Sequence, residues 1–380
     1  MKSELNTKLG KFERNYRNGL RKALLSGVVL LGLSFLAHSA EQSQAKPQPD
    51  KIPPYQIKQI EPGVWAALKP APHRIVDSNI VIVESNKCLT IVDANDNLSN
   101  ARQLTQDIKK LSDKPVCYVI NTHWHSDHIF ANAVYKKAFP TIRHFVGHVS
   151  LPKLIETKAK PQLAEKIGQW ENAIKAAKQR VADGIGEPQL EKKIANAEIQ
   201  LADLRATKLI TPTLMVEQKL ALPVEGIKVE LLNFGKGHTE GDLVVYLPEK
   251  KLLLSGDLFD HLPYAGHGYP SEWLHTLKSI GKLSFETVIP GHGAVQQGKE
   301  TLHRIQWLIE ESLSLANKAV AKDQSKKAFM ESVKIAQYHQ KFAPLDELGE
   351  RAYKQFIPEF FERAYLEASG QLADRQENNQ

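Results

Sequence analysis

The sequence predicts an α/β fold in which a β-sheet is covered by helices. Residues 54–147 read as a β-meander followed by strand–helix–strand units, and residues 213–293 repeat that order. A chain that alternates in this way buries the apolar faces of its strands under helices. At 380 residues the chain is longer than one minimal domain requires, so we expect one large domain with additions.

The first half contains short apolar, β-branched runs separated by polar turns, which is the pattern of strands. The expected strands cover residues 63–68, 79–85, 88–95, 116–122 and 143–148. Between them, Leu104, Ile108 and Leu111 recur at helical spacing and predict a helix over residues 100–112.

Residues 151–212 interrupt this pattern with two helices. Apolar residues alternate spacings of four and three on both sides of the breaker DGIGEP, at Leu163, Ile167, Trp170, Ile174, Ala177 and Val181, and at Leu190, Ile194, Ala197, Leu201 and Leu204. Such a seam on two consecutive helices predicts an antiparallel helical hairpin. We interpret the hairpin as an inserted structural arm, with a lid or a dimerisation element as the alternative. The protein is accordingly expected to be a monomer, or a dimer through the hairpin.

The second half returns to the strand pattern. We expect strands over residues 213–216, 219–222, 227–234, 242–248, 251–257 and 286–293, with a helix over 271–280. Three further helices are expected over residues 302–321, 328–340 and 353–368. The predicted organisation is a domain over residues 54–300 that contains the insertion, followed by a helical extension over 301–380.

The first 45 residues have the composition of an export signal with a linker. A basic region ending at Arg21 and Lys22 precedes the apolar run 23–37, which is short for a membrane span. Small residues allow cleavage after Ser39 or Ala45. We therefore expect a periplasmic or secreted protein with no stable membrane association after cleavage. The alternative is an uncleaved N-terminal membrane anchor.

The charge of the chain excludes one class of partner. The formal net charge is +7, and residues 1–45 hold seven Lys or Arg against three Glu. The remainder carries 43 basic and 40 acidic residues. This near balance does not indicate a nucleic-acid surface, and we expect a small-molecule substrate.

Two cysteines are present in the whole chain, Cys88 and Cys117. Low cysteine usage fits an exported protein that relies on a large core. Each cysteine begins an apolar, strand-like run. We predict two buried free thiols, and a disulfide is the alternative if the two strands are neighbours.

Three histidines and an aspartate stand within six residues, in the pattern H-x-H-x-D-H from His123 to His128. His123 and His125 are two apart at a strand end, so both imidazoles project from one edge. Asp127 and His128 follow where the chain turns away. Burying such polar groups without partners costs roughly 2–7 kcal/mol, so the pattern indicates metal ligands.

Three residues of the same chemistry follow strands in the second half of the chain. They are His238 in GKGHTEGD, Asp257 in LLLSGDLF and His292 in IPGHGAV. A neighbouring glycine lets the backbone bend close to a shared site. Imidazole and carboxylate ligands without thiolate suit zinc, and less often iron or manganese.

These motifs resemble those of the metallo-β-lactamase fold superfamily, in the same order and at strand ends. The resemblance covers residues 55–300 and leaves out the hairpin and the C-terminal helices. It implies a four-layer αββα sandwich with two zinc ions per chain. The implied ligands are His123, His125 and His238 for the first metal, Asp127, His128 and His292 for the second, and Asp257 as the bridge.

The resemblance implies a zinc-dependent hydrolase. Zinc lowers the pKa of coordinated water from about 15.7 towards about 7, so a metal-bound hydroxide would attack the carbonyl of an ester, thioester, lactone or amide. Asp127 is the candidate catalytic residue, because it would ligate the second metal and orient the nucleophile or shuttle its proton. Typical antibiotic-degrading relatives have Cys where this chain has Asp257, which favours a general hydrolase.

Two alternative enzymes remain open. A β-lactamase acting on antibiotics in the periplasm is favoured by the export signal and disfavoured by Asp257. A mononuclear iron sulfur dioxygenase would use His123, His238 and Asp257 alone. The chain also has a full set of ligands for a second metal, which argues against this alternative. A binding or scaffold protein would be expected to have lost ligands, and this chain has all of them.

Further residues near the motifs are candidates for lining a substrate pocket. Trp124 lies inside the first motif, on the face opposite the ligands. The others follow Asp257 in the stretch FDHLPYAGHGYP and are His261, Tyr264, His267 and Tyr269. Asp93 is expected to hold loops near the site by hydrogen bonds rather than to bind metal.

Overall fold

The computed structural model describes residues 54–71, 73–75, 77–185, 188–342 and 346–372. The expected export signal in residues 1–45 lies outside these residues. No helix within the described ranges has the length and apolar character needed to cross a membrane.

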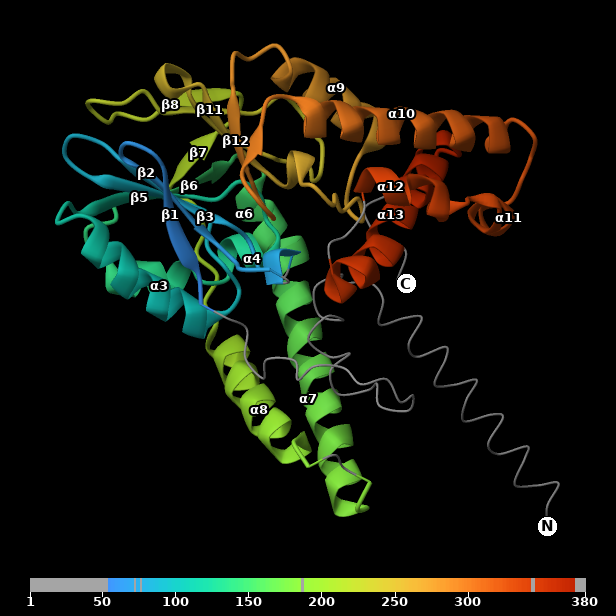
Figure 1. Cartoon of the computed structure of the whole chain (residues 1–380), viewed down its shortest axis with the longest axis horizontal. Coiled ribbons are helices and arrows are strands. Elements are labelled where there is room, and N and C mark those ends of the chain that lie inside the picture. The colour runs from blue at the N-terminus through green and yellow to red at the C-terminus, as the bar shows by residue number, and fades with distance from the viewer. Residues whose placement is uncertain (1–53, 72, 76, 186–187, 343–345, 373–380) are drawn as a thin grey trace.

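Two β-sheets form the centre of the molecule (Figure 1). The first has seven strands in chain order, β1 (Gln56–Glu61), β2 (Val64–Leu68), β3 (Ile80–Glu84), β4 (Leu89–Val92), β5 (Val116–Ile120), β6 (His144–His148) and β7 (Leu214–Val216). The second has six strands, in the order β13 (Gln296–Gln297), β12 (Thr287–Pro290), β11 (Leu252–Gly256), β10 (Val244–Leu247), β9 (Glu230–Leu232) and β8 (Lys219–Ala221). Both sheets combine an antiparallel meander with parallel pairs, which are β4 to β7 in the first sheet and β11–β12 in the second.

Helices cover the outer face of each sheet. α3 (Leu98–Leu111) and α5 (Asn132–Ala138) pack on the first sheet, and α9 (Pro270–Ile280), α10 (Glu300–Val320) and α13 (Glu347–Ala368) pack on the second. Strand alternation explains the layers. In β3, Val81 and Val83 face the core between the sheets, whereas Ile80 and Ile82 face α3. The predicted four-layer αββα sandwich is confirmed.

The C-terminal helices belong to the outer layer of the second sheet. α10 and α13 share one hydrophobic cluster with α9 and with strand residues such as Leu253 and Val288. The helix expected over residues 328–340 is divided into α11 (Lys326–Ser332), a 3-10 turn (Ile335–Tyr338) and α12 (His339–Phe342). α11 ends where the Ser332 hydroxyl donates back to the Phe329 carbonyl at 2.6 Å, which satisfies one of the last carbonyls of the helix.

The predicted helical hairpin is confirmed. α7 (Lys160–Ala182) and α8 (Leu190–Ala206) pack through the expected seam, in which Trp170, Ile174 and Ile194 are buried. Figure 1 shows the pair extending away from the sheets. α6 (Leu151–Leu154) and a π-helical turn (Ile155–Ala159) lead into α7.

The prediction of two free thiols is wrong. Cys88 and Cys117 form a disulfide, with their Cα atoms 5.8 Å apart. The reason is the order of the strands. β4 and β5 are parallel neighbours, and the register shift after Leu89 leaves Cys117 between the paired residues Val116 and Tyr118, within disulfide reach of Cys88. Both cysteines are buried in the core between the sheets.

Candidate metal centre

The seven predicted ligand residues meet where strands of both sheets end. His123 and His125 follow β5, and the short helix α4 (Ser126–Ile129) carries Asp127 and His128. Asp257 and His292 follow the parallel neighbours β11 and β12, whose carboxyl ends lie at the same edge. His238 comes from the loop between β9 and β10.

Two glycines make this convergence sterically possible. Gly256 has φ +52°, which turns the chain sharply just before Asp257, and a side chain there would meet Thr122. Gly291 lies against the Asp257 carboxylate, so that a Cβ atom at position 291 would occupy the space of Oδ1. Glycine therefore brings the ends of β11 and β12 to the site.

The first group contains three imidazoles and one carboxylate. His125 Nδ1 lies 3.0 Å from His123 Nε2 and 2.9 Å from His238 Nε2. Asp257 Oδ2 lies 3.7 Å from His123 Nε2 and 3.4 Å from His238 Nε2. One donor atom from each residue lies within 4.8 Å of all the others, which suits a single metal ion.

The second group lies on the other side of Asp257. Asp127 Oδ2 is 3.0 Å from His292 Nε2 and 3.7 Å from His128 Nε2. Asp257 faces this group as well, because Oδ1 lies 3.2 Å from His128 Nε2 and Oδ2 lies 3.5 Å from His292 Nε2. The carboxylate of Asp257 is therefore shared between the two groups.

The chemistry of these donors fits a metal cation. His128 Nε2 and Asp257 Oδ1 are buried and make no hydrogen bond to any residue that the structure describes, although they lie 3.2 Å apart. Leaving buried polar atoms unpaired is costly, so a ligand that satisfies both at once is strongly favoured. The described residues thus hold a cluster with the composition of a divalent-metal site.

Hydrogen bonds on the side away from the cluster fix the orientation of three imidazoles. Thr122 Oγ1 lies 3.1 Å from His123 Nδ1, Asp93 Oδ2 lies 2.9 Å from His128 Nδ1, and His238 Nδ1 donates to the Tyr264 carbonyl at 2.9 Å. Each contact engages Nδ1 and turns Nε2 towards the cluster. Asp93 also accepts from the Thr122 amide at 2.8 Å, in agreement with its expected role in holding loops.

The two groups differ in their electrostatics. Burial lowers the pKa of His123 and His125 well below the ordinary histidine range. Burial acts in the same direction on His128 and His292, but Asp257 and other nearby carboxylates outweigh it and hold both pKa values well above that range. The carboxylates of the second group therefore stabilise a positive charge at this position, and a bound cation would supply such a charge in place of the protons.

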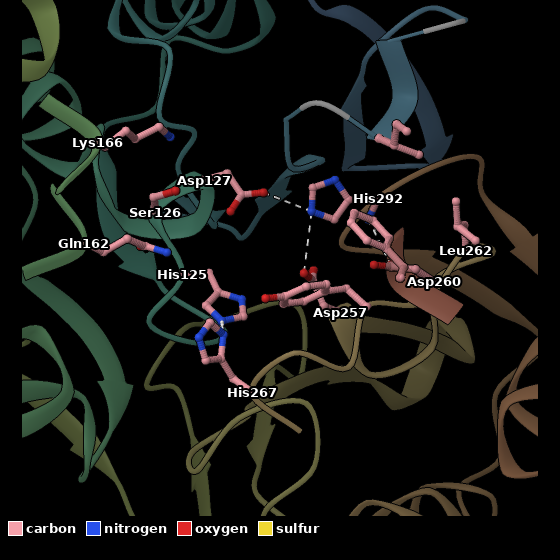
Figure 2. Close-up of a pocket in the computed structure, with 13 residues that line it drawn as sticks. His125, Ser126, Asp127, Gln162, Lys166, Asp257, Asp260, Leu262, His267 and His292 are labelled. Carbon is pink, nitrogen blue, oxygen red and sulfur yellow. Dashed lines mark hydrogen bonds and ion pairs between the residues drawn. The ribbon is translucent and has the colours of Figure 1, made fainter. Parts of the chain in front are cut away.

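A pocket opens beside the cluster (Figure 2). Of the five residues proposed from the sequence as its lining, Tyr264 and His267 line it. Trp124 is buried behind His125 and His267, with ring centroids 4.5 and 4.9 Å away.

The remaining two proposed lining residues lie outside the lining of this pocket. His261 contacts Arg304, with Nδ1 3.2 Å from the guanidinium. The Tyr269 ring is buried beneath Lys236, whose Nζ lies 4.6 Å from the ring centroid.

Sequence reasoning missed Asp260, which lies with Asp257 and His292 in a third group of donor atoms within 4.8 Å. It is buried, and its Oδ1 accepts from the His292 amide at 3.0 Å. Burial and then the charge of Asp257 raise its pKa well above the ordinary range. A second carboxylate three residues after Asp257 was the available signal.

Comparison with known proteins agrees with this geometry. The sequence model of the metallo-beta-lactamase superfamily matches residues 74–292, which is more than half of the chain. The chain belongs to the metallo-beta-lactamase superfamily. The cluster of donor atoms lies within the matched residues.

Two relatives illustrate the range of this similarity. The chain is 26% identical over 253 residues to the linear primary-alkylsulfatase of a Pseudomonas species, a match that covers 63% of this chain and 44% of that protein. It is also 26% identical over 261 residues to the metallo-beta-lactamase type 2 of Bacillus cereus, covering 66% and 82%. The chain thus spans less than half the length of the alkylsulfatase.

Solved structures with a similar fold include two metallo-beta-lactamases. The DIM-1 enzyme has a TM-score of 0.49 and 19% identity, covering 69% of this chain and 100% of its own. The enzyme from Pontibacter korlensis has a TM-score of 0.48 and 18% identity, covering 67% and 99%.

Proposed function

We propose that this chain is a binuclear zinc hydrolase that cleaves an ester, thioester, lactone or amide bond. The observation that carries the proposal is the position of Asp257. Its carboxylate faces His123 and His238 on one side and His128 on the other, at 3.2–3.7 Å. One negative charge shared by two groups of nitrogen and oxygen donors suits a bridge between two cations.

The proposed ligand set follows from the two groups. His123, His125 and His238 would hold the first zinc ion, Asp127, His128 and His292 the second, with Asp257 between them. When bound, the ions would supply the positive charge that acidifies water and polarises the bond to be cleaved.

The remaining chemistry belongs to residues of the chain. The contacts of Thr122, Asp93 and the Tyr264 carbonyl hold the imidazoles in place without metal, so the site is preorganised. Asp127 lines the pocket, where its carboxylate can orient the attacking water and accept its proton. Ser78 fixes the backbone of Asp127, because its hydroxyl donates to the Asp127 carbonyl.

A panel of substrates tests the proposal. Purified protein supplied with zinc should hydrolyse at least one of a simple aryl ester, a thioester, a lactone and an anilide, and the Asp127→Asn variant should lose most of that activity. A primary alkyl sulfate belongs in the panel because one relative is named as an alkylsulfatase. Absence of turnover on the whole panel by zinc-loaded protein would overturn the proposal.

β-Lactam hydrolysis is the second candidate function, and the match to the Bacillus cereus enzyme favours it. Turnover of a chromogenic cephalosporin at a rate above that of the esters would establish it. Metal analysis that finds one iron and no zinc per chain would instead favour the dioxygenase alternative.

We also propose that the mature protein is exported. The basic region and apolar run within residues 1–45 support this location. N-terminal sequencing of the protein from a periplasmic fraction should find a chain that begins after Ser39 or Ala45. A full-length chain retained in the membrane fraction would contradict cleavage.

A further inference from the structure

The pocket beside the metal centre receives residues from both additions to the sandwich. Gln162 and Lys166 come from α7 of the hairpin, and Phe356 comes from the C-terminal helix α13. The hairpin is therefore more than a self-contained arm, because the first two turns of α7 form part of the pocket wall.

The α7 wall is polar and carries a positive charge. Gln162 and Lys166 are four residues apart, so they occupy the same face of the helix. The side chain of Lys166 is only 8% exposed, and its Nζ lies 2.5 Å from Asp96 Oδ2. Asp96 also accepts from the Ser126 hydroxyl at 3.2 Å. An ammonium group has three N–H donors, so the contact with Asp96 leaves further donors to face the pocket.

Gln162 adds an unsatisfied polar atom to the same wall. Its Oε1 is buried and makes no hydrogen bond within the described part of the chain. The Nε2 group of the same amide carries two donors, and these donors, rather than Oε1, can bind an anionic group that Lys166 attracts. The two side chains together suit the recognition of a small anionic group such as a carboxylate.

Apolar side chains also line the pocket. They are Ile75, Leu262 and Phe356, and the Phe356 ring packs edge-on against that of Tyr264, with ring centroids 5.1 Å apart. Figure 2 shows Lys166 and Gln162 on one side of Asp127 and Leu262 on the far side of His292, so the donor cluster lies between them.

We propose that Lys166 and Gln162 determine specificity for substrates with an anionic group on one side of the scissile bond and an apolar group on the other. The inference rests on the proposed hydrolase function and adds a substrate class to it. An amphipathic molecule that spans the pocket places its anionic end on α7, its apolar end on Leu262 and Phe356, and its scissile bond at the donor cluster.

Lys166 also anchors the hairpin to the sandwich through Asp96, and the test must separate that structural role from recognition. Matched pairs of esters provide the separation. 4-Nitrophenyl hydrogen glutarate is compared with neutral 4-nitrophenyl butyrate, and the phenylacetyl ester of glycolate with ethyl phenylacetate. The two pairs carry the carboxylate on opposite sides of the scissile bond.

The variants are Lys166→Met, Lys166→Arg and Gln162→Glu, with Lys175→Met as the control. Lys175 is exposed on the same helix and does not line this pocket. Loss of a charge-assisted hydrogen bond lowers affinity by about tenfold or more, so Lys166→Met should raise KM for the preferred anionic ester by at least that factor. KM for the neutral ester should change far less than KM for the anionic ester, Lys166→Arg should restore most of the preference, and Lys175→Met should match wild type.

Gln162→Glu keeps the test valid if Lys166→Met fails to fold. This variant places a negative charge beside the subsite without removing the contact between Lys166 and Asp96. It should therefore raise KM for the anionic ester and leave KM for the neutral ester nearly unchanged. Equal losses on charged and neutral esters would show a structural role and overturn the proposal. An absence of preference in wild type would overturn it as well.

A binding measurement makes the inference testable even if no ester is hydrolysed. In isothermal titration of zinc-loaded protein, glutarate should bind more tightly than its isosteric monoamide, glutaramate, because only glutarate can place one carboxylate on α7 while the other lies at the donor cluster. Lys166→Met should abolish the difference. A protein that hydrolyses no ester but keeps this difference would refute the hydrolase function alone. Equal binding of glutarate and glutaramate by wild type would refute the subsite.

Discussion

Asp257 is the residue on which the two groups of donor atoms depend. It contacts histidines of both groups, and the charges of His128 and His292 outweigh burial and hold the pKa of Asp257 well below the ordinary range. Its carboxylate is therefore ionised in the folded protein, and its negative charge offsets the repulsion between two cations.

Removing that charge should affect the second site more than the first. We expect Asp257→Asn to keep the fold, to fall towards one metal per chain, and to lose roughly a hundredfold or more in hydrolysis. Asp257→Cys should recover part of the second-site binding, since a thiolate is a good zinc ligand with the same charge. Metal analysis and ester kinetics measure both effects. An Asp257→Asn protein with two tightly bound zinc ions and normal turnover would refute the bridging role.

Asp242 should make stability depend on pH. Burial raises its pKa to about 7, although its carboxylate accepts hydrogen bonds from the Thr239 amide and hydroxyl. The folded pKa lies above the ordinary value of 3.8, so the associated stability is complete below that value and is lost as pH rises through about 7.

The Asp242→Asn variant removes this titration. Because an amide does not ionise, only wild type should lose stability as pH rises, so the free energy of unfolding of the variant should increase relative to that of wild type by about 2–3 kcal/mol between pH 5 and pH 7 and change little above pH 7. Chemical denaturation of both proteins in chelator, without metal, measures the difference. A gap that stays constant across this range would show that Asp242 does not titrate there.

The sequence revealed the seven candidate ligands because each stands in a short motif after a strand. To predict that these residues meet, it was enough to assume that the strand ends lie at one edge of the sandwich. Gln162 and Lys166 could not be found in this way, because they belong to a helix whose docking onto the sandwich depends on distant contacts such as that with Asp96. Asp260 follows the motif residue Asp257 by three positions, but it belongs to no recognisable motif of its own, so that spacing was not used.

At the level of elements, the hairpin combines an independent seam with a functional end. The seam between α7 and α8 buries its own apolar residues, whereas the start of α7 lines the pocket. Leu163 packs both in the seam and against the cluster around Trp124 and Phe130.

Replacing residues 160–208 by a short Gly/Ser linker should leave the sandwich folded and able to bind metal, because the seam satisfies its own apolar face. Turnover should fall, since the pocket loses Gln162 and Lys166. Circular dichroism, metal content and ester kinetics together check this. Global unfolding with loss of metal would show that the hairpin is part of the core.

The disulfide links two neighbouring strands, β4 and β5, across a sequence separation of 29 residues. A cross-link over a loop of this size constrains the unfolded chain and contributes roughly 3–4 kcal/mol. We expect the free energy of unfolding of the Cys88→Ala, Cys117→Ala double variant to be lower by that amount, so the variant should unfold at a lower denaturant concentration. Its metal content should not change. Equal denaturation midpoints for variant and wild type would contradict a stabilising disulfide.

Most strands could be predicted because they are buried and therefore apolar. β1 was missed because it is an edge strand with the polar sequence QIKQIE, and β13 because it is two residues long. The state of the cysteines could not be predicted, since it depends on which strands are neighbours, and one sequence does not specify that order.

At the scale of the whole molecule, the metal centre joins the two halves of the sandwich. The first sheet supplies the H-x-H-x-D-H motif after β5, and the second supplies His238, Asp257 and His292. The first and the second group of donors each take residues from both sheets when Asp257 is counted with both. Metal binding should therefore stabilise the contact between the sheets as well as enable chemistry.

The most direct test of this account is the metal content of the purified protein and of single-ligand variants, measured by mass spectrometry after removal of free metal. We expect about two zinc ions per chain in wild type and about one in each of His123→Ala, His238→Ala and His292→Ala. One iron ion per chain in wild type, or wild-type metal content in all three variants, would contradict the two-metal centre.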